Sequence, residues 1–156
     1  MAIEIERKFI VAGDGWRPHV IRSERLKQGY LSTGNGVTVR IRTIDDERAF
    51  LTIKGGGSAL ARAEFEYAIP IADARQLLGY CTGIPITKHR HILDLPGGEW
   101  IVDVFEGRHR GLVLAEVELK APTGDLALPA WLGREVTGDS QYYNSSLAAL
   151  PSGGEI

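Results

Sequence analysis

The stretch Glu4-Ile5-Glu6-Arg7-Lys8 near the start of the chain sets charged residues two positions apart. Side chains of a β-strand alternate between its two faces, so Glu4, Glu6 and Lys8 share one face and Ile5 lies on the other. A solvent-washed face is the simplest explanation, because antiparallel sheets often have one wet side. Whether this face is merely wet or serves a ligand depends on the other strands.

Length and composition are those of a globular protein. The chain has 156 residues, of which 44% are hydrophobic and 24% are charged, with a formal net charge of −2. This length favours one domain with a real core, which we place at residues 1–150, followed by a disordered tail at 151–156. A near-neutral total gives no reason to expect a nucleic-acid or membrane surface.

Cysteine usage and hydropathy bear on the compartment. Cys81 is the one cysteine, so no internal disulfide can form, and the first residues lack a basic segment followed by an apolar run of signal-peptide length. No apolar run approaches the roughly 20 residues that span a bilayer. We therefore expect a soluble, cytoplasmic protein.

Short segments rich in β-branched and aromatic residues dominate the chain. Glycine-bearing turns such as 32–36 and 95–98 separate them, so we expect antiparallel hairpin pairing. Two short helices are expected, one from Asp73 to Gly79 and one capped by Asp139 that continues to Leu150. The eight predicted strands are residues 3–11, 25–32, 36–45, 48–54, 63–69, 86–95, 99–105 and 111–121.

Charged side chains recur two positions apart on most of these strands. A random wet face would mix in serine, threonine, asparagine and glutamine. Like charges at this spacing repel each other across a dry interior, so they are tolerable only if something of opposite sign lies between them. The acids with this pattern are Glu4, Glu6, Glu64, Glu66, Asp103, Glu116 and Glu118, and the bases are Lys8, Arg40, Arg42, Lys54, Arg62, Lys88 and Arg90.

The two sets of charges suit a metal and a polyanion. Carboxylates are the ligands of Mg²⁺ and Mn²⁺, whereas arginine and lysine clusters bind phosphate oxygens. If the strands close into a barrel, one face must point inward, and so many charges cannot pack dry there. We therefore expect a mainly β (α+β) fold, an eight-stranded antiparallel β-barrel tunnel with a charged, wet interior and a few flanking helices.

The opening stretch resembles the ExExK signature of the CYTH superfamily, the triphosphate tunnel metalloenzymes. Further motifs follow in the family's order and cover the chain to about Leu150. The short length resembles the small bacterial branch, whose characterised members are chiefly inorganic triphosphatases. The matching motifs include Gln28-Gly29-Tyr30-Leu31, Val39-Arg40-Ile41-Arg42, Thr52-Ile53-Lys54-Gly55, Arg62-Ala63-Glu64-Phe65-Glu66, Lys88-His89-Arg90, Glu116-Val117-Glu118 and Glu135-Val136-Thr137-Gly138-Asp139.

The resemblance implies hydrolysis of inorganic triphosphate to pyrophosphate and phosphate, with one or two Mg²⁺ or Mn²⁺ ions. We expect Glu64 and Glu66 to complete a second metal site or to orient the attacking water. The expected phosphate-binding residues are Lys8, Arg40, Arg42, Lys54, Arg62, Lys88 and Arg90, and the expected metal ligands are Glu4, Glu6, Asp103, Glu116 and Glu118.

A catalytic lysine–tyrosine pair is also implied by the resemblance, and Lys8 and Tyr30 occupy the matching positions. Cationic neighbours would make the Lys8 ammonium lose its proton more readily, and the Tyr30 hydroxyl could hold the deprotonated form as a general base. This hypothesis predicts an alkaline activity optimum. One departure is Ser140-Gln141 after Asp139, where the family usually carries lysine or arginine, so substrate contacts from that segment are in doubt.

Other functions fit the same tunnel. Within enzymes, it could take thiamine triphosphate or a nucleoside triphosphate, or cyclise ATP; outside enzymes, it could bind polyphosphate without turnover. Nothing in the sequence specifies a base-binding pocket, so inorganic triphosphate ranks first. The sequence leaves open the metal preference, the number of ions and the oligomeric state, a homodimer included.

Overall fold

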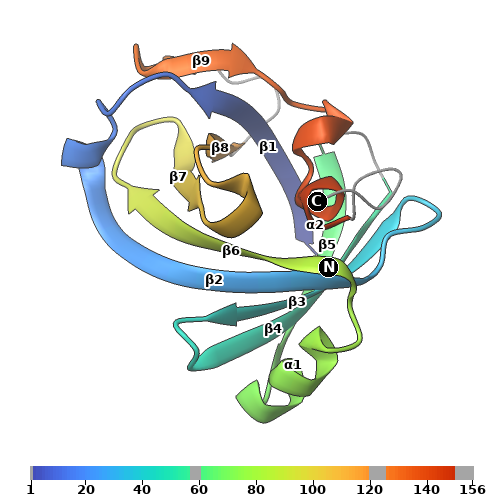
Figure 1. Cartoon of the computed structure of the whole chain (residues 1–156). Helices are drawn as coiled ribbons and strands as arrows, with labels where there is room; N and C mark the ends of the chain where they lie inside the picture. The colour runs from blue at the N-terminus through green and yellow to red at the C-terminus, as the bar shows by residue number, and fades with distance from the viewer. Residues whose placement is uncertain (1, 57–60, 120–125, 150–156) are drawn as a thin grey trace.

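The computed structural model describes residues 2–56, 61–119 and 126–149. Its strands form one antiparallel sheet in the order β5-β4-β3-β2-β6-β7-β8-β1-β9, and a further pairing of β1 with β5 closes the first eight into a barrel (Figure 1). The strands are β1 (Ala2–Val11), β2 (Val20–Ser32), β3 (Val37–Ile44), β4 (Arg48–Gly55), β5 (Ala61–Ile69), β6 (Thr82–Leu93), β7 (Gly98–Phe105), β8 (Val113–Leu119) and β9 (Leu132–Glu135).

The predicted eight-stranded antiparallel barrel is confirmed, with differences at several strand ends. β2 begins at Val20, before the predicted residue 25, because polar residues at 22–25 occupy both faces and hide the alternation. β6 begins at Thr82 rather than at residue 86, although Gly83 and Pro85 weaken a strand pattern. The prediction missed β9, which is four residues long and pairs with the second half of β1.

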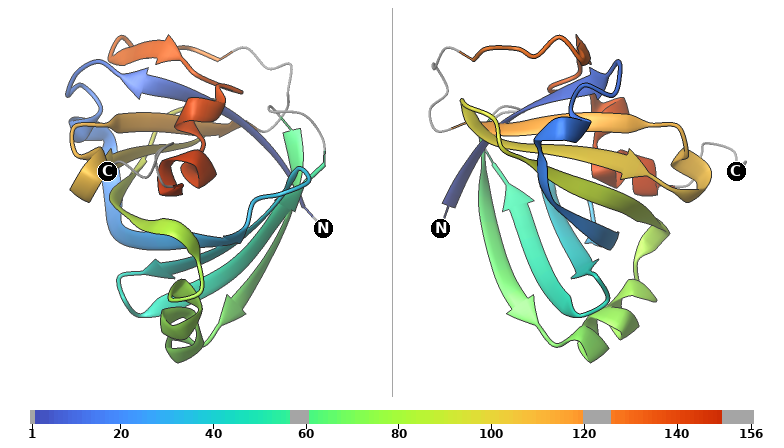
Figure 2. Two further views of the ribbon diagram at one scale, coloured as in Figure 1. Left: turned by 45° about the vertical axis from the view of Figure 1, so that its right-hand side comes forward. Right: turned by 90° about the vertical axis from the view of Figure 1, so that its left-hand side faces the viewer.

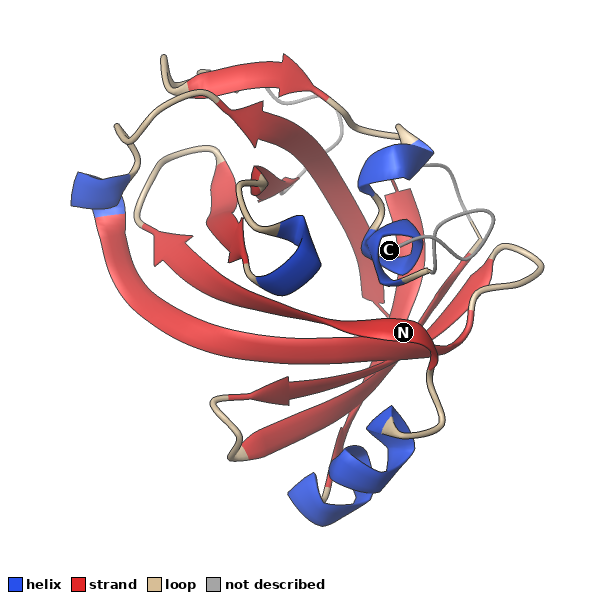
Figure 3. Cartoon of the chain, viewed as in Figure 1, coloured by secondary structure: helices blue, strands red, loops and turns tan. Residues whose placement is uncertain are grey.

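Few residues are helical (Figure 3). α1 (Ile71–Leu78) begins directly after Pro70, two residues before the predicted start at Asp73. α2 (Asn144–Ala148) does not begin at Asp139. The Asp139 carboxylate caps a separate 3₁₀ helix, Ser140–Tyr142, and extended backbone at Tyr143 separates that helix from α2. The predicted continuation to Leu150 and the predicted tail at 151–156 lie outside the described residues. Within the described part of the chain, no helix combines the length and apolar character that crossing a membrane requires.

Apolar side chains pack mainly on the outside of the barrel. α1 covers the outer face of β3 and β4, where Ala74 packs against Ile41 and Ala49. On the other side, Trp16 and Trp100 are nearly fully buried in a cluster that Leu132 of β9 helps to cover. This outward core leaves the barrel interior to the charged side chains.

One end of the interior is apolar, which the sequence pattern did not predict. Tyr30, Ile86, Phe105 and Leu114 form a buried cluster with Ala148 of α2. α2 lies over this end of the barrel (Figure 2). The charged part of the interior is therefore bounded on one side by an apolar plug.

Arg108 fastens α2 to the barrel. Its Nη2 donates hydrogen bonds to the carbonyl oxygens of Leu147 (2.6 Å) and Ala149 (2.8 Å), and His109 Nε2 lies 2.6 Å from the same Leu147 oxygen. A helix this short is marginal without tertiary contacts. We expect Arg108→Ala to lower the free energy of unfolding by about 1–3 kcal/mol, measured by urea denaturation, because charge-assisted bonds are lost.

Arg110→Ala is the matched control for this prediction. Arg110 is exposed and only two positions away, so its loss should change stability by less than about 0.5 kcal/mol. Equal denaturation midpoints for Arg108→Ala and Arg110→Ala would show that the bonds to α2 contribute nothing.

Candidate active site

A cavity of about 440 Å³ lies inside the barrel and receives side chains from all eight barrel strands. Its lining is almost entirely charged. The lining residues are Glu6, Arg22, Glu24, Arg40, Arg42, Lys54, Glu64, Glu66, Arg90, Ile92, Glu99, Ile101, Glu116, Glu118 and Asn144. A smaller adjoining pocket shares Glu6, Arg40, Lys54 and Asn144 with it and adds Lys8, Tyr30 and Arg62.

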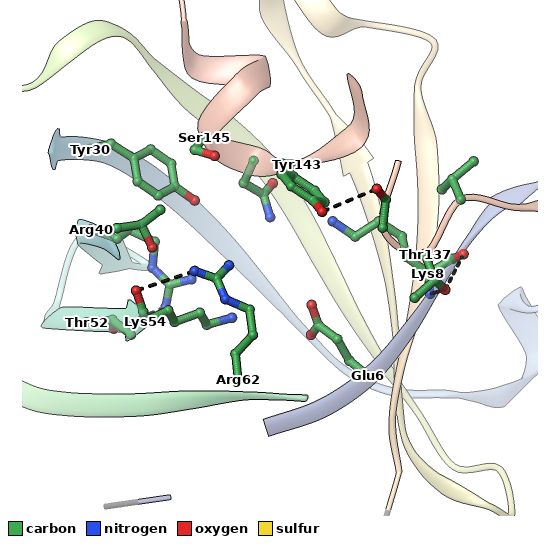
Figure 4. A pocket seen from close by; sticks show the side chains of 14 residues that line it. Glu6, Lys8, Tyr30, Arg40, Thr52, Lys54, Arg62, Thr137, Tyr143 and Ser145 are labelled. Atoms are coloured by element: carbon green, nitrogen blue, oxygen red, sulfur yellow. Dashed lines mark hydrogen bonds between the residues drawn. The ribbon is translucent and has the colours of Figure 1, made fainter. Parts of the chain in front are cut away.

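The wall formed by β3, β4 and β5 carries most of the bases of the site (Figure 4), and we call it the basic wall, although β5 also contributes Glu64 and Glu66. Arg40 Nη2 donates to Thr52 Oγ1 (3.1 Å), and that hydroxyl donates to Glu66 Oε2 (3.2 Å). Arg62 Nη2 lies 3.4 Å from the carbonyl oxygen of Gly36, just before β3, and 3.4 Å from that of Lys54, near the end of β4. These contacts fix both guanidinium groups at the cavity.

The facing wall is acidic and comes from β1 and β8. Strand register sets Glu6 opposite Glu118, and Lys8 opposite Glu116. Carboxylates in such a lining suit Mg²⁺ or Mn²⁺, which prefer oxygen ligands. Among the residues described, no group of three acid, histidine or cysteine side chains is gathered closely enough to hold an ion as it stands. The structure does not describe the side chain of Glu4, which is another expected ligand.

Lys8 is buried against Glu116, with Nζ 3.3 Å from its Oε1 and 3.1 Å from the carbonyl oxygen of Tyr142. Burial opposes the charge on Lys8, but Glu116 and Glu6 outweigh it and hold the pKa of Lys8 above its ordinary value. The predicted lowering of this pKa is therefore wrong, because the nearest charged groups are carboxylates. Tyr30 lines the same pocket, but in the described structure no hydrogen bond joins it to Lys8.

Asp103 forms a buried triad with two bases. Its carboxylate accepts hydrogen bonds from Arg90 Nε (2.9 Å) and Nη2 (2.8 Å), and Lys88 Nζ lies 2.8 Å from Oδ2. Lys88 is fully buried and also donates to Asn144 Oδ1 (3.0 Å). Neither Asp103 nor Lys88 lines the described cavities, whereas Arg90 does. The structure therefore places two of the expected site residues behind the site.

The triad has strongly shifted pKa values. Burial, with smaller contributions from the positive charges of Arg90 and Arg42, lowers the pKa of Lys88 to about 7 despite the opposing effect of Asp103. Burial would raise the pKa of Asp103, but Arg90 and Lys88 outweigh it and hold that pKa well below its usual range. Asp103 therefore remains ionised at neutral pH and keeps Arg90 directed toward the cavity.

Sequence reasoning missed several cavity residues. Glu24 lies on β2 with the same parity as Tyr30, but the predicted strand started one residue after it. Glu99 shares the parity of Asp103 on β7. Gln28 also lies on this inner side of β2 and is fully buried. Counting by twos from the predicted site residues would have found all three.

Known proteins resemble this chain over nearly its whole length. A family model described as the CYTH domain matches residues 2–149. The inorganic triphosphatase of Acetivibrio thermocellus is 40% identical over 152 residues, which are 97% of this chain and 96% of that protein.

Solved structures agree with this match. The inorganic triphosphatase NE1496 has a TM-score of 0.68 and 33% identity, covering 98% of this chain and 99% of its own. The PH1012 protein from Pyrococcus horikoshii OT3 has a TM-score of 0.61 and 19% identity, covering 76% of this chain and 80% of its own. That second likeness shows the fold alone.

Proposed function

The chain belongs to the CYTH family, and from this premise we propose that it hydrolyses inorganic triphosphate to pyrophosphate and phosphate. The observation that carries the proposal is a cavity inside the barrel whose lining is almost entirely charged and holds both acids and bases. The 40% identity to the inorganic triphosphatase of Acetivibrio thermocellus supports it. The lining residues described for the larger cavity include two isoleucines and no aromatic residue, which offers a nucleobase little to stack on.

The acidic wall is the proposed site of a divalent ion, Mg²⁺ or Mn²⁺. Glu6, Glu116 and Glu118 supply oxygen donors from adjoining strands, and Glu4 is the fourth candidate. When bound, the ion supplies positive charge that neutralises phosphate oxygens. Asp103 was predicted to be a ligand too, but its oxygens already bind Arg90 and Lys88, so we now propose that it positions those two bases.

The basic wall is the proposed binding site for the phosphate chain. Hydrolysis of a triphosphate needs positioning and charge stabilisation rather than covalent help from the protein. Arg40 and Arg42 of this wall, and Arg90 of β6, line the cavity, where they can donate to phosphate oxygens. Lys54 and Arg62 extend this set along the adjoining pocket.

Glu64 and Glu66 are the candidates for orienting the attacking water. Both line the cavity, and Thr52 fixes one oxygen of Glu66. A carboxylate held in this way can accept a hydrogen bond from water beside the phosphate chain. Lys8, held as a charged ammonium beside Glu116, is proposed to donate to the substrate, and Tyr30 lines the opposite side of the same pocket (Figure 4).

A substrate panel tests the proposed function. Phosphate release is measured with Mg²⁺ and with Mn²⁺ for triphosphate, pyrophosphate, ATP and thiamine triphosphate. We expect kcat/KM for triphosphate to exceed that for ATP by at least about tenfold, because the cavity binds phosphate and not a base. Removing the metal with a chelator should abolish turnover.

Two outcomes would contradict the proposal. Faster turnover of ATP or thiamine triphosphate would assign a different substrate to the tunnel. Tight binding of triphosphate without turnover would make the protein a binding module.

A further inference from the structure

Arg42 differs from three neighbouring bases of the site, Lys8, Arg40 and Arg90, in its charged neighbours. Close to it in the site, Lys8 pairs with Glu116 (3.3 Å), Arg40 with Glu66 (3.8 Å) and Arg90 with Asp103 (2.8 Å). In the described part of the chain, no carboxylate lies within ion-pair distance of Arg42.

Arg40 and Arg90 are the charged groups with the largest effect on the pKa of Arg42, and Tyr30 and Asp103 oppose them more weakly. Burial lowers this pKa, and the positive charges of Arg40 and Arg90 lower it further. These are the conditions under which a guanidinium gains most from an incoming anion. A phosphate group that binds here displaces no carboxylate.

Gln28 makes the hydrogen bond that holds this guanidinium. The two residues face each other in the β2–β3 register, and Arg42 Nε donates to Gln28 Oε1 at 2.8 Å. An arginine has only donors, so the amide must turn its oxygen toward Nε. The amide nitrogen is buried and has no partner among the described residues. One bond through Nε therefore fixes Arg42 and leaves both terminal nitrogens for a ligand.

We propose that Gln28 is a positioning residue for anion binding, whose neutral oxygen fixes the guanidinium of Arg42 while leaving its charge for a phosphate group. A carboxylate at this position would hold Arg42 in the same place but would neutralise it. An apolar side chain would leave Nε without an acceptor. The identity of the anion as triphosphate rests on the proposed function; the positioning role does not.

Gln28→Glu tests the proposal because it changes the charge and little else. The two side chains have the same shape, and no described hydrogen bond from the amide nitrogen is lost. We expect KM for triphosphate to rise at least about tenfold while kcat changes less than about threefold, since binding energy is removed uniformly. The urea midpoint should stay level or rise, because Arg42 gains an ion pair. A merely structural role predicts a lower midpoint and no selective rise in KM.

Gln28→Met is the matched control for shape. It has similar length but no acceptor, so we expect a lower urea midpoint, opposite in sign to the effect of Gln28→Glu. The Arg42→Gln background tests whether the effect passes through Arg42. There, Gln28→Glu should raise KM by less than about twofold. An equal rise in both backgrounds would overturn the proposal.

Binding without turnover separates this inference from the proposed function. Calorimetry measures the Kd of triphosphate in a chelator, for the native protein and for Gln28→Glu. If the native protein binds triphosphate without hydrolysing it and Gln28→Glu weakens binding, the inference stands and the proposed function falls. If the native protein hydrolyses triphosphate and Gln28→Glu changes neither KM nor Kd, the inference falls. If the native protein neither binds nor hydrolyses triphosphate, with or without Mg²⁺, both fall.

Discussion

Replacing Asp103 with asparagine is expected to lower the free energy of unfolding by about 3–5 kcal/mol, the largest stability effect we expect from one substitution here. Asp103 is 2% exposed and is the common partner of Lys88 and Arg90. Removing its charge leaves two bases buried without compensation. Urea denaturation at pH 7 measures the loss.

The difference in unfolding free energy between the native protein and Asp103→Asn should shrink in acid. The pKa of Asp103 is far below its usual value in the folded protein, so its contribution is complete above its unfolded pKa, near 4, and is lost as the pH falls further. The gap between native protein and Asp103→Asn should therefore narrow below about pH 4. If the stability difference between the two proteins stayed constant down to pH 2, the charge of Asp103 would not be its cause.

Lys88→Met is the matched control within the triad. It should cost less than Asp103→Asn, because Arg90 still makes two hydrogen bonds to Asp103. The double variant should recover part of the Asp103→Asn loss, since one uncompensated base is gone. Strictly additive losses would show that the three groups do not act together.

The second large effect concerns catalysis. We expect Glu116→Gln to lower kcat/KM for triphosphate by at least about 100-fold at limiting metal, and to raise the metal concentration needed for half-maximal rate. Glu116 lies in the cavity beside Lys8, and although burial opposes its ionisation, Lys8 and Arg90 hold its pKa below the ordinary value. It is therefore an anion at neutral pH, as a metal ligand must be.

Glu135→Gln provides the control for the same chemical change. Glu135 is paired with Arg7 outside the barrel, at 2.6 Å, and lines neither described cavity. Its loss should leave metal dependence unchanged. If Glu116→Gln showed the metal dependence of Glu135→Gln, Glu116 would have to be removed from the proposed ligands.

Alternation along the chain determined which side of each strand faces the cavity. Because side chains change face at every residue, the pairs Arg40 and Arg42, Glu64 and Glu66, and Glu116 and Glu118 all had to lie on one side of their strands. The apolar residues between them then had to pack outward. That local rule, with the family resemblance, was sufficient to predict the barrel and most of its lining.

Strand alternation could not predict which charges meet. Lys8 pairs with Glu116, more than a hundred residues away, because β1 and β8 are neighbours in a particular register, and that carboxylate reverses the predicted shift of the Lys8 pKa. Asp103 and Lys88 share the parity of the cavity residues but lie behind them, next to the apolar plug that holds Phe105.

The sequence by itself therefore determined the eight barrel strands, their inner and outer faces and the kind of ligand that the inner face suits, because these follow from spacing along the chain. Only the tertiary structure decided that Arg42 has Gln28 and no carboxylate as its partner in the described residues. It also decided that α2 covers one end of the barrel and that β9 pairs with the second half of β1. These features depend on register and closure between distant segments, which no spacing within one segment specifies.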